Sequence, residues 1–309
     1  MTKVIWPVCI TVDCDALDEH HAVWGLPSPS ASASERFWIE GVSAASAFLQ
    51  NHNVVATFFV VGSRVPVSEG KHLLQTIIAH HEVGNHTWSH PWDLSRMDVI
   101  RVQEELVRNH VFLTDMGMTP RGFRSPGYHL SPAVVRTLLS LDYQYSSSQL
   151  TGFVYPLAKY AASLWMRLRK RKTRTIVHPI SDIFTPRVPY RPHPLHPWRR
   201  GNTPLWEIPI ATSTWGLPAV GPLIHAIPHE VFFFTPVDRP WILNFHLTDF
   251  IDERSFSDLA RVDPMLRSSR TKRLQRITQL LATATRQNRE FCTLSQLCNR
   301  FTGSFVSEI

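Results

Sequence analysis

The chain has 309 residues, enough for one large domain or two ordinary ones. Hydrophobic residues make up 43% and charged residues 18%, a composition that excludes disordered, fibrous and collagen-like chains. The 32 Lys and Arg outnumber the 25 Asp and Glu, so the net charge is +7. Such a charge allows an anionic partner such as a nucleic acid, a phospholipid surface or an acidic glycan, but does not choose among them.

Short apolar strands alternate with amphipathic helices along the chain, which predicts an α/β fold. The expected strands are residues 4–12, 56–61, 82–85, 143–146, 205–209, 241–245 and 291–293. The expected helices are residues 35–52, 72–81, 98–116, 131–140 and 267–286. Residues 26–34 are small and predict a surface loop or a flap over a substrate, and residues 114–122 predict a turn.

The cysteines and the N-terminal residues bear on cellular location. The four cysteines are too few and too scattered for a disulfide scaffold, and none forms a Cys-x-x-Cys pair, which argues against a thiolate zinc site. Residues 1–15 contain one Lys, a Pro within a short apolar run and acidic side chains, a pattern unlike a signal peptide. We therefore expect a cytoplasmic protein, either soluble or peripheral at the inner face of the membrane.

Two aspartates end the first expected strand, in the sequence ITVDCD. Because side chains alternate on a strand, Asp13 and Asp15 share one face and Cys14 lies on the other. Two carboxylates on one face are costly unless a metal ion or a cation lies between them. The pattern indicates either an ion site or a polar strand end.

Two histidines follow the third expected strand. His86 and His90 are four residues apart, so on a helical turn both imidazoles could chelate one ion. Gly84 before them and Pro91 after them predict a strand that leads into a short helix. The same spacing is common in proteins that bind no metal, so this motif alone leaves both interpretations open.

An arginine and a third histidine occupy positions where α/β proteins often place functional groups. In RGFRSPGYHL, Pro126 and Gly127 predict a turn with Arg124 just before it and Tyr128 just after it. In WILNFH, an apolar strand ends at His246, at the edge of the sheet where active sites gather. Taken singly, each is equally well a loop arginine or a structural histidine.

In this order, D-x-D, H-x-x-x-H, R-x-P-G-Y and the strand-end histidine resemble the polysaccharide deacetylases, also called the NodB-homology family or carbohydrate esterase family 4. The resemblance covers about residues 2–150 and 203–298. It implies one domain over residues 1–309, a distorted (β/α) barrel with its site at the carboxyl ends of the strands. Residues 152–203 would then be an insertion that caps the barrel or contacts a membrane surface.

The resemblance also implies a role for each motif residue. In this family one Asp and two His hold a divalent ion, usually zinc, and these ligands map onto Asp15, His86 and His90. Asp13 corresponds to the general base, Arg124 orients it, and His246 corresponds to the general acid. The implied substrate contacts are the backbone N–H of Tyr128 at the oxyanion and the rings of Trp88 and Trp92 stacked on a sugar. The candidates for the carboxylate that partners the acid are Asp249 and Glu207.

These residues imply a metal-dependent hydrolase of a linear amide bond. A bound ion with an open coordination position polarises a carbonyl and makes water more acidic. We therefore expect removal of an acetyl or formyl group from an amino sugar in a glycan, a glycolipid or a sugar nucleotide. One alternative is an amidohydrolase acting on a non-sugar amide or a cyclic imide. Another is a peripheral membrane or glycan-binding protein without catalysis.

The inserted segment bears on the partner. Phe153–Arg174 combines a helical apolar face with six basic residues within 167–174. A basic amphipathic helix is typical of contact with a membrane surface, which suits a lipid-linked substrate. The alternatives are a helix packed on the barrel with a solvated basic end, and contact with nucleic acid. No nucleic-acid recognition motif is present, so we expect no nucleic-acid partner.

Overall fold

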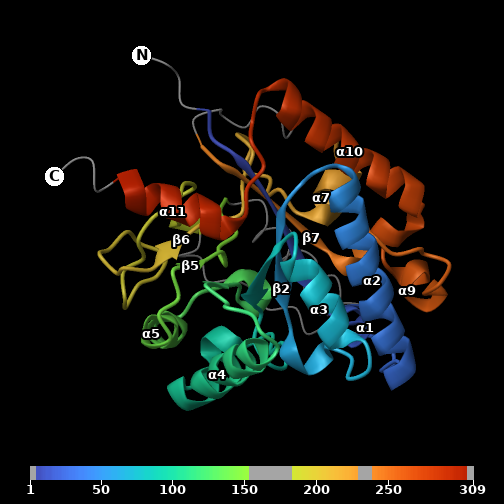
Figure 1. The fold of residues 1–309 in the computed structure, drawn as a ribbon, viewed down its shortest axis with the longest axis horizontal. Coiled ribbons are helices and arrows are strands. Elements are labelled where there is room, and N and C mark those ends of the chain that lie inside the picture. Colours follow the sequence, from blue (N-terminus) through green and yellow to red (C-terminus); the bar gives the residue numbers. More distant parts are fainter. Residues whose placement is uncertain (1–4, 153–182, 229–238, 305–309) are drawn as a thin grey trace, which may run out of the picture.

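A computed structural model describes residues 5–152, 183–228 and 239–304 (Figure 1). Its centre is one sheet of parallel strands in the order β6-β5-β4-β3-β2-β1-β7. The strands are β1 (Val8–Cys14), β2 (Ala56–Val60), β3 (Glu82–Asn85), β4 (Gly122–Phe123), β5 (Tyr145–Ser146), β6 (Trp206–Glu207) and β7 (Trp241–His246). The sheet curls into part of a barrel, which confirms the predicted distorted (β/α) barrel.

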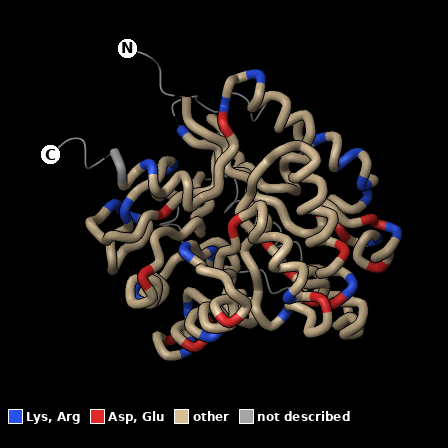
Figure 2. Tube along the Cα trace, in the orientation of Figure 1, with Lys and Arg blue, Asp and Glu red and all other residues tan. Residues whose placement is uncertain are grey.

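Helices cover the outside of the curled sheet (Figure 1). They are α1 (Leu17–Trp24), α2 (Ala31–Asn51), α3 (Gly70–Ile78), α4 (Val99–Asp115), α5 (Pro132–Ser140), α7 (Gly221–Ala226), α9 (Ser257–Val262), α10 (Arg270–Arg286) and α11 (Leu294–Ser304). None of these described helices is both long and apolar enough to cross a bilayer. Within the described residues, Lys and Arg lie on several elements, α10 among them (Figure 2).

The side chains of strand β1 alternate between the helix-covered face of the sheet and the inside of the curled sheet. Val8, Ile10, Val12 and Cys14 belong to the main hydrophobic cluster, together with buried side chains of α2. The intervening Thr11 and Asp13 turn to the inside of the curled sheet, where they meet polar groups of neighbouring strands. The period of two therefore places the main core on one face of β1, whereas the other face carries Cys9 in a second apolar cluster and then the polar Thr11 and Asp13.

The register brings the motifs to one edge of the sheet. Asp13 lies opposite His246 on β7 and opposite Phe59 on β2, while Val60 of β2 lies opposite Asn85 on β3. Because all three pairs are parallel, their carboxyl ends meet at the same side. The residue after Asn85 is His86, so three motifs distant in sequence meet there.

Several boundaries differ from the predicted ones. The first strand begins and ends later, and residues 31–34 belong to α2 rather than to a loop, because Ser30 caps that helix by accepting the N–H of Ala33 at 3.2 Å. Phe291 forms only a single bridge to Val8. Strand β4 and helices α1, α7, α9 and α11 have no counterpart among the predicted elements. Most are too short for a hydrophobic period to show.

The predicted insertion is described only in part. Residues 153–182, which contain the basic amphipathic segment, lie outside the described residues. The following residues include single antiparallel bridges that join Tyr190 to Glu207 and Pro192 to Arg200. Membrane contact through residues 153–174 therefore stays a prediction.

Candidate active site

The three predicted metal ligands meet in a buried cluster. Asp15 follows β1, and His86 and His90 follow β3. The Nε2 atoms of both histidines lie 3.3 Å from Asp15 Oδ1, and one ligand atom from each residue falls within 4.8 Å of the others. Asp15 Oδ1 accepts no hydrogen bond of ordinary geometry within the described part of the chain. One carboxylate oxygen and two imidazole nitrogens at this spacing fit a divalent cation.

A left-handed loop, rather than the expected helical turn, brings the two imidazoles together. Thr87 and His90 have φ angles of 67° and 56°, a region that non-glycine residues seldom occupy. The loop is held by the Thr87 N–H, which donates to Asn85 Oδ1 at 2.8 Å, and by the His90 N–H, which donates to Thr87 Oγ1 at 3.1 Å. The helical turn expected between His86 and His90 is therefore wrong, although the two imidazoles do converge, and a short 3-10 helix begins only at Leu94.

His86 is oriented by the backbone of the arginine motif. Its Nδ1 lies 2.7 Å from the Arg124 carbonyl oxygen, which makes Nδ1 the donor and leaves Nε2 free to bind an ion. Burial alone would lower the pKa of His86, but the contact with Asp15 outweighs burial and raises it. Burial lowers the pKa of His90 to about 4.

These pKa shifts predict how metal affinity changes with pH. The proton on His86 competes with the metal below its raised pKa, whereas His90 stays neutral down to about pH 4. Between the pKa of His86 and about pH 4, metal binding displaces one proton, the one on His86. The metal dissociation constant should therefore rise about tenfold for each unit by which the pH is lowered. Calorimetric titration with zinc at several pH values checks this, and a slope of two protons would contradict it.

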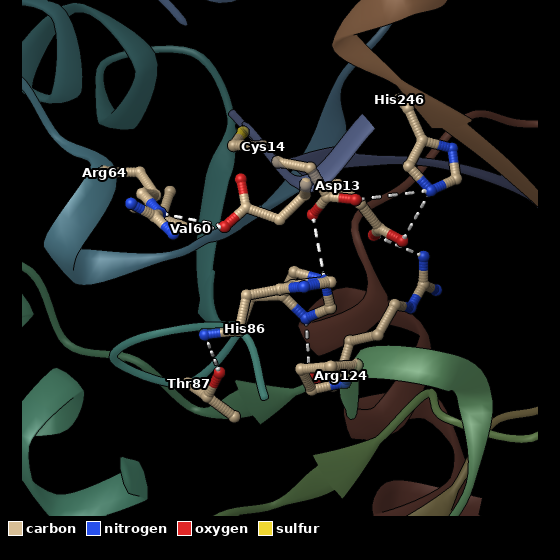
Figure 3. A network of polar contacts seen from close by, with 12 residues as sticks. Asp13, Cys14, Val60, Arg64, His86, Thr87, Arg124 and His246 are labelled. Carbon is tan, nitrogen blue, oxygen red and sulfur yellow. Dashed lines mark hydrogen bonds and ion pairs between the residues drawn. The ribbon is translucent and has the colours of Figure 1, made fainter. Parts of the chain in front are cut away.

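Asp13 and Arg124 form a buried ion pair beside this cluster (Figure 3). Arg124 Nη1 donates to Asp13 Oδ1 at 2.9 Å, and its Nε donates to the Ser147 carbonyl oxygen at 2.7 Å. Burial by itself would raise the pKa of Asp13, but Arg124 and the nearby imidazoles outweigh it and lower the pKa. Asp13 is therefore a carboxylate near neutral pH, held in one orientation.

Asn244 is central to the site, and the sequence interpretation missed it. Its amide donates to Asp13 Oδ2 at 3.1 Å and to the Tyr128 hydroxyl at 2.8 Å, and its oxygen accepts hydrogen bonds from Thr11 and Arg124. The alternation of side chains on a strand could have identified it, because Asn244 lies two residues before His246 on β7 and so faces the same side.

Tyr128 reaches the site through its side chain rather than its backbone. Its N–H, expected at the oxyanion, donates instead to the Ser125 carbonyl oxygen at 3.1 Å. Its hydroxyl lies 3.2 Å from Asp13 Oδ2 and 3.1 Å from His246 Nε2. The described geometry thus contradicts the backbone role and places a phenol between the two residues expected to move protons.

His246 points its Nε2 into the site, 3.7 Å from carboxylate oxygens of both Asp13 and Asp15 (Figure 3). Neither candidate partner contacts its ring. Asp249 accepts the backbone N–H of His246 at 2.7 Å, and Glu207 accepts the backbone N–H groups of Ser148 and Gln149, each at 2.8 Å. Both carboxylates are buried in structural hydrogen bonds, so the expected pairing with the imidazole of His246 is wrong.

A cavity of about 440 Å³ is lined by the motif residues Asp13, Asp15, His86, His90, Tyr128 and His246. Trp92 lines it beside His90, with ring centroids 4.8 Å apart, as a substrate contact requires. Trp88 does not line it and packs instead between Phe112 and the guanidinium of Arg108. The structure therefore contradicts the prediction for Trp88, because the left-handed loop turns that ring toward α4.

Comparison with known proteins agrees with this geometry. Residues 38–146 match the family model for polysaccharide deacetylases. The chain is 39% identical over 80 residues to chitin deacetylase 1 of Cryptococcus neoformans, which covers 26% of this chain and 17% of that protein. It is 29% identical over 97 residues to a peptidoglycan-N-acetylglucosamine deacetylase of Bacillus cereus, which covers 31% of this chain and 44% of that protein. The chain thus aligns with less than half the length of these relatives.

A solved structure extends the likeness to the whole fold. A Mycobacterium smegmatis protein assigned as a polysaccharide deacetylase superposes with a TM-score of 0.61, covering 98% of this chain and 92% of its own. At 17% identity this match shows the fold alone. Residues 38–146 therefore match the polysaccharide deacetylase family, and the fold that contains them is shared with a protein assigned as a member of it.

Proposed function

We propose that the protein is a metal-dependent hydrolase that removes an acetyl or formyl group from the nitrogen of an amino sugar. The observation that carries this proposal is the convergence of two sets of groups on one cavity. Asp15, His86 and His90 can hold an ion, and the ion pair of Asp13 with Arg124 lies beside His246. Zinc suits this mixture of nitrogen and oxygen ligands best, and when bound it polarises an amide carbonyl and acidifies water.

The residues of the chain supply the proton transfers. Asp13, ionised and fixed by Arg124, accepts the proton of the attacking water. His246 presents Nε2 on the same side and donates a proton to the departing amine, which is otherwise a poor leaving group. The Tyr128 hydroxyl contacts both side chains and holds them at a fixed separation.

The amino-sugar part of the proposal draws support from the relatives. They are named for chitin, chitooligosaccharides and peptidoglycan N-acetylglucosamine. In this chain Trp92 offers a ring at the cavity wall, and aromatic rings bind the apolar faces of sugars. A glycan, a glycolipid or a sugar nucleotide can carry such a group.

The test is mass spectrometry of N-acetyl and N-formyl amino sugars, glycolipids and sugar nucleotides after incubation with the zinc-loaded protein. The His86→Ala variant is the blank, and small amides and cyclic imides are incubated in parallel. We expect loss of one acyl mass from an amino sugar, dependent on metal and on His86. Turnover of only the non-sugar amides or imides would overturn the substrate class, and no turnover of any compound would overturn the activity.

A further inference from the structure

Part of the cavity wall comes from elements that no motif of the family includes. His20, Val23 and Trp24 come from α1, and Pro222, His225 and Ala226 come from α7. The segment that leads from α9 into η6 (Met265–Arg267) adds Asp263, Pro264 and Met265. All of these residues lie outside the matched range 38–146. We call this part the α1–α7–η6 wall.

A buried imidazole–carboxylate pair is built into this wall. His225 Nε2 lies 2.6 Å from Asp249 Oδ1, and the two side chains are 5% and 0% exposed. The other oxygen, Asp249 Oδ2, accepts the backbone N–H of His246 at 2.7 Å, so one carboxylate fixes both residues. Helix α7 can lie this close to Asp249 because residue 221 is glycine, since a Cβ there would lie 2.3 Å from Asp249 Oδ1.

His225 has one nitrogen left for a ligand. Nε2 is directed at Asp249, so Nδ1 is the remaining polar atom of the ring, and it accepts a hydrogen bond in the tautomer that carries its hydrogen on Nε2. This Nδ1 is buried and has no hydrogen-bond partner among the described residues. A buried polar atom without a partner is costly, which indicates that a ligand satisfies it. A hydroxyl or an N–H group of a ligand is the matching donor.

His20 on α1 offers a second buried ring nitrogen to the cavity. It lines the same cavity, and its Nε2 is likewise buried without a partner in the described ranges. Burial lowers its pKa to about 4, so the ring is neutral near pH 7 and forms hydrogen bonds without adding charge. The wall therefore combines two hydrogen-bonding imidazoles with the apolar surfaces of Trp24, Pro264 and Met265.

The two imidazoles and the apolar side chains of the wall suit a compact ligand that has hydroxyl donors and an apolar face. A sugar ring has both features. The cavity volume of about 440 Å³ lies within the range of about 300–1,000 Å³ for sites that take one small molecule. Trp24, His225 and Met265 line the same cavity as Asp13, Asp15 and His246, so a single sugar can contact the wall and the motif residues together.

We propose that the α1–α7–η6 wall is a binding site for a terminal or single amino sugar, and that His225, positioned by Asp249, determines specificity by accepting a sugar hydroxyl. Resting on the function proposed above, this makes the substrate a single N-acyl amino sugar, free or at the end of a carrier, rather than the interior of a polymer.

The experiment has a catalytic arm and a binding arm. In the first, the zinc-loaded protein acts on N-acetylglucosamine and its oligomers of up to five units, with tandem mass spectrometry locating each lost acetyl group. We expect cleavage of the single unit and of a terminal unit only. For His225→Gln we expect KM to rise about three- to tenfold, the effect of one lost hydrogen bond, with kcat little changed. The exposed His196, changed to Gln, is the matched control.

In the second arm, metal-free protein is titrated with glucosamine, N-acetylglucosamine and chitotetraose, with tryptophan fluorescence as the readout. Binding of the single sugars, weakened in His225→Gln but not in His196→Gln, supports the proposal even if no acyl group is removed, in which case only the proposed activity fails. Internal deacetylation whose efficiency grows with chain length overturns it. So does a metal-free wild-type protein that binds no single sugar.

Discussion

Changing Asp13 to asparagine is expected to lower kcat by about 10²–10⁴-fold while the protein still folds and still binds metal. The side chain lies beside Asp15 without belonging to the ligand cluster, and its carboxylate is the group that Arg124 keeps ionised. Asparagine retains the shape and an oxygen for Arg124, but it cannot take a proton from water. Steady-state kinetics together with the zinc content of the purified variant measure both parts of this prediction.

Two variants frame this result. Asp252→Asn, at a carboxylate with 42% of its side chain exposed, is the matched control and should leave kcat unchanged. His86→Ala should lose bound zinc and turnover together, because it removes a ligand of the cluster. If Asp13→Asn turns over at a near-normal rate with zinc bound, Asp13 is not the general base and another group accepts the proton.

The sequence was sufficient for the parts of the site that depend on strand periodicity. Alternation on a strand placed Asp13 and Asp15 on one face, and the structure has Asp15 beside His86 and His90 and both carboxylates beside His246. The strand-end position of His246 follows from the same period. These inferences succeed because a strand fixes side-chain direction with no knowledge of the rest of the fold.

The sequence was not sufficient where backbone conformation or distant packing decides. Positive φ angles at Thr87 and His90 replace the expected helical turn, and the same loop turns Trp88 away from the cavity. No local sequence pattern predicts positive φ angles in non-glycine residues such as these. Asn244 was missed because its role appears only when β7 lies beside β1 and Arg124 reaches across from the other side.

The α1–α7–η6 wall could not be predicted from the sequence for a related reason. Helices α1 and α7 are eight and six residues long, too short for a hydrophobic period to stand out. His225 and Asp249 are 24 residues apart and meet only because α7 packs against the end of β7. The motifs therefore predict the proposed catalytic groups, whereas the proposed sugar-binding groups are brought together only by the packing of short helices.

Replacing Arg124 with methionine is expected to destabilise the protein by about 3–5 kcal/mol, the usual cost of removing one partner from a buried ion pair. Arg124 is fully buried and donates to the Ser147 carbonyl and hydroxyl oxygens, to Thr11 and to Asp13, and it stacks on Phe59 at 4.4 Å. Methionine fills similar space but leaves the Asp13 carboxylate buried without its cation. Urea unfolding followed by circular dichroism measures the change.

The double variant Asp13→Asn/Arg124→Met separates the charge effect from the lost hydrogen bonds. Removing the stranded carboxylate should restore part of the lost stability, because asparagine can be buried at much lower cost than an unpaired charge. The Ser147 carbonyl oxygen still lacks the donor it has in the wild type, so full recovery is not expected. A double variant that is no more stable than Arg124→Met alone would mean that Arg124 stabilises the fold through Ser147, Thr11 and Phe59. Its role would then be to support the sheet interior, with the ionisation of Asp13 maintained by the neighbouring imidazoles.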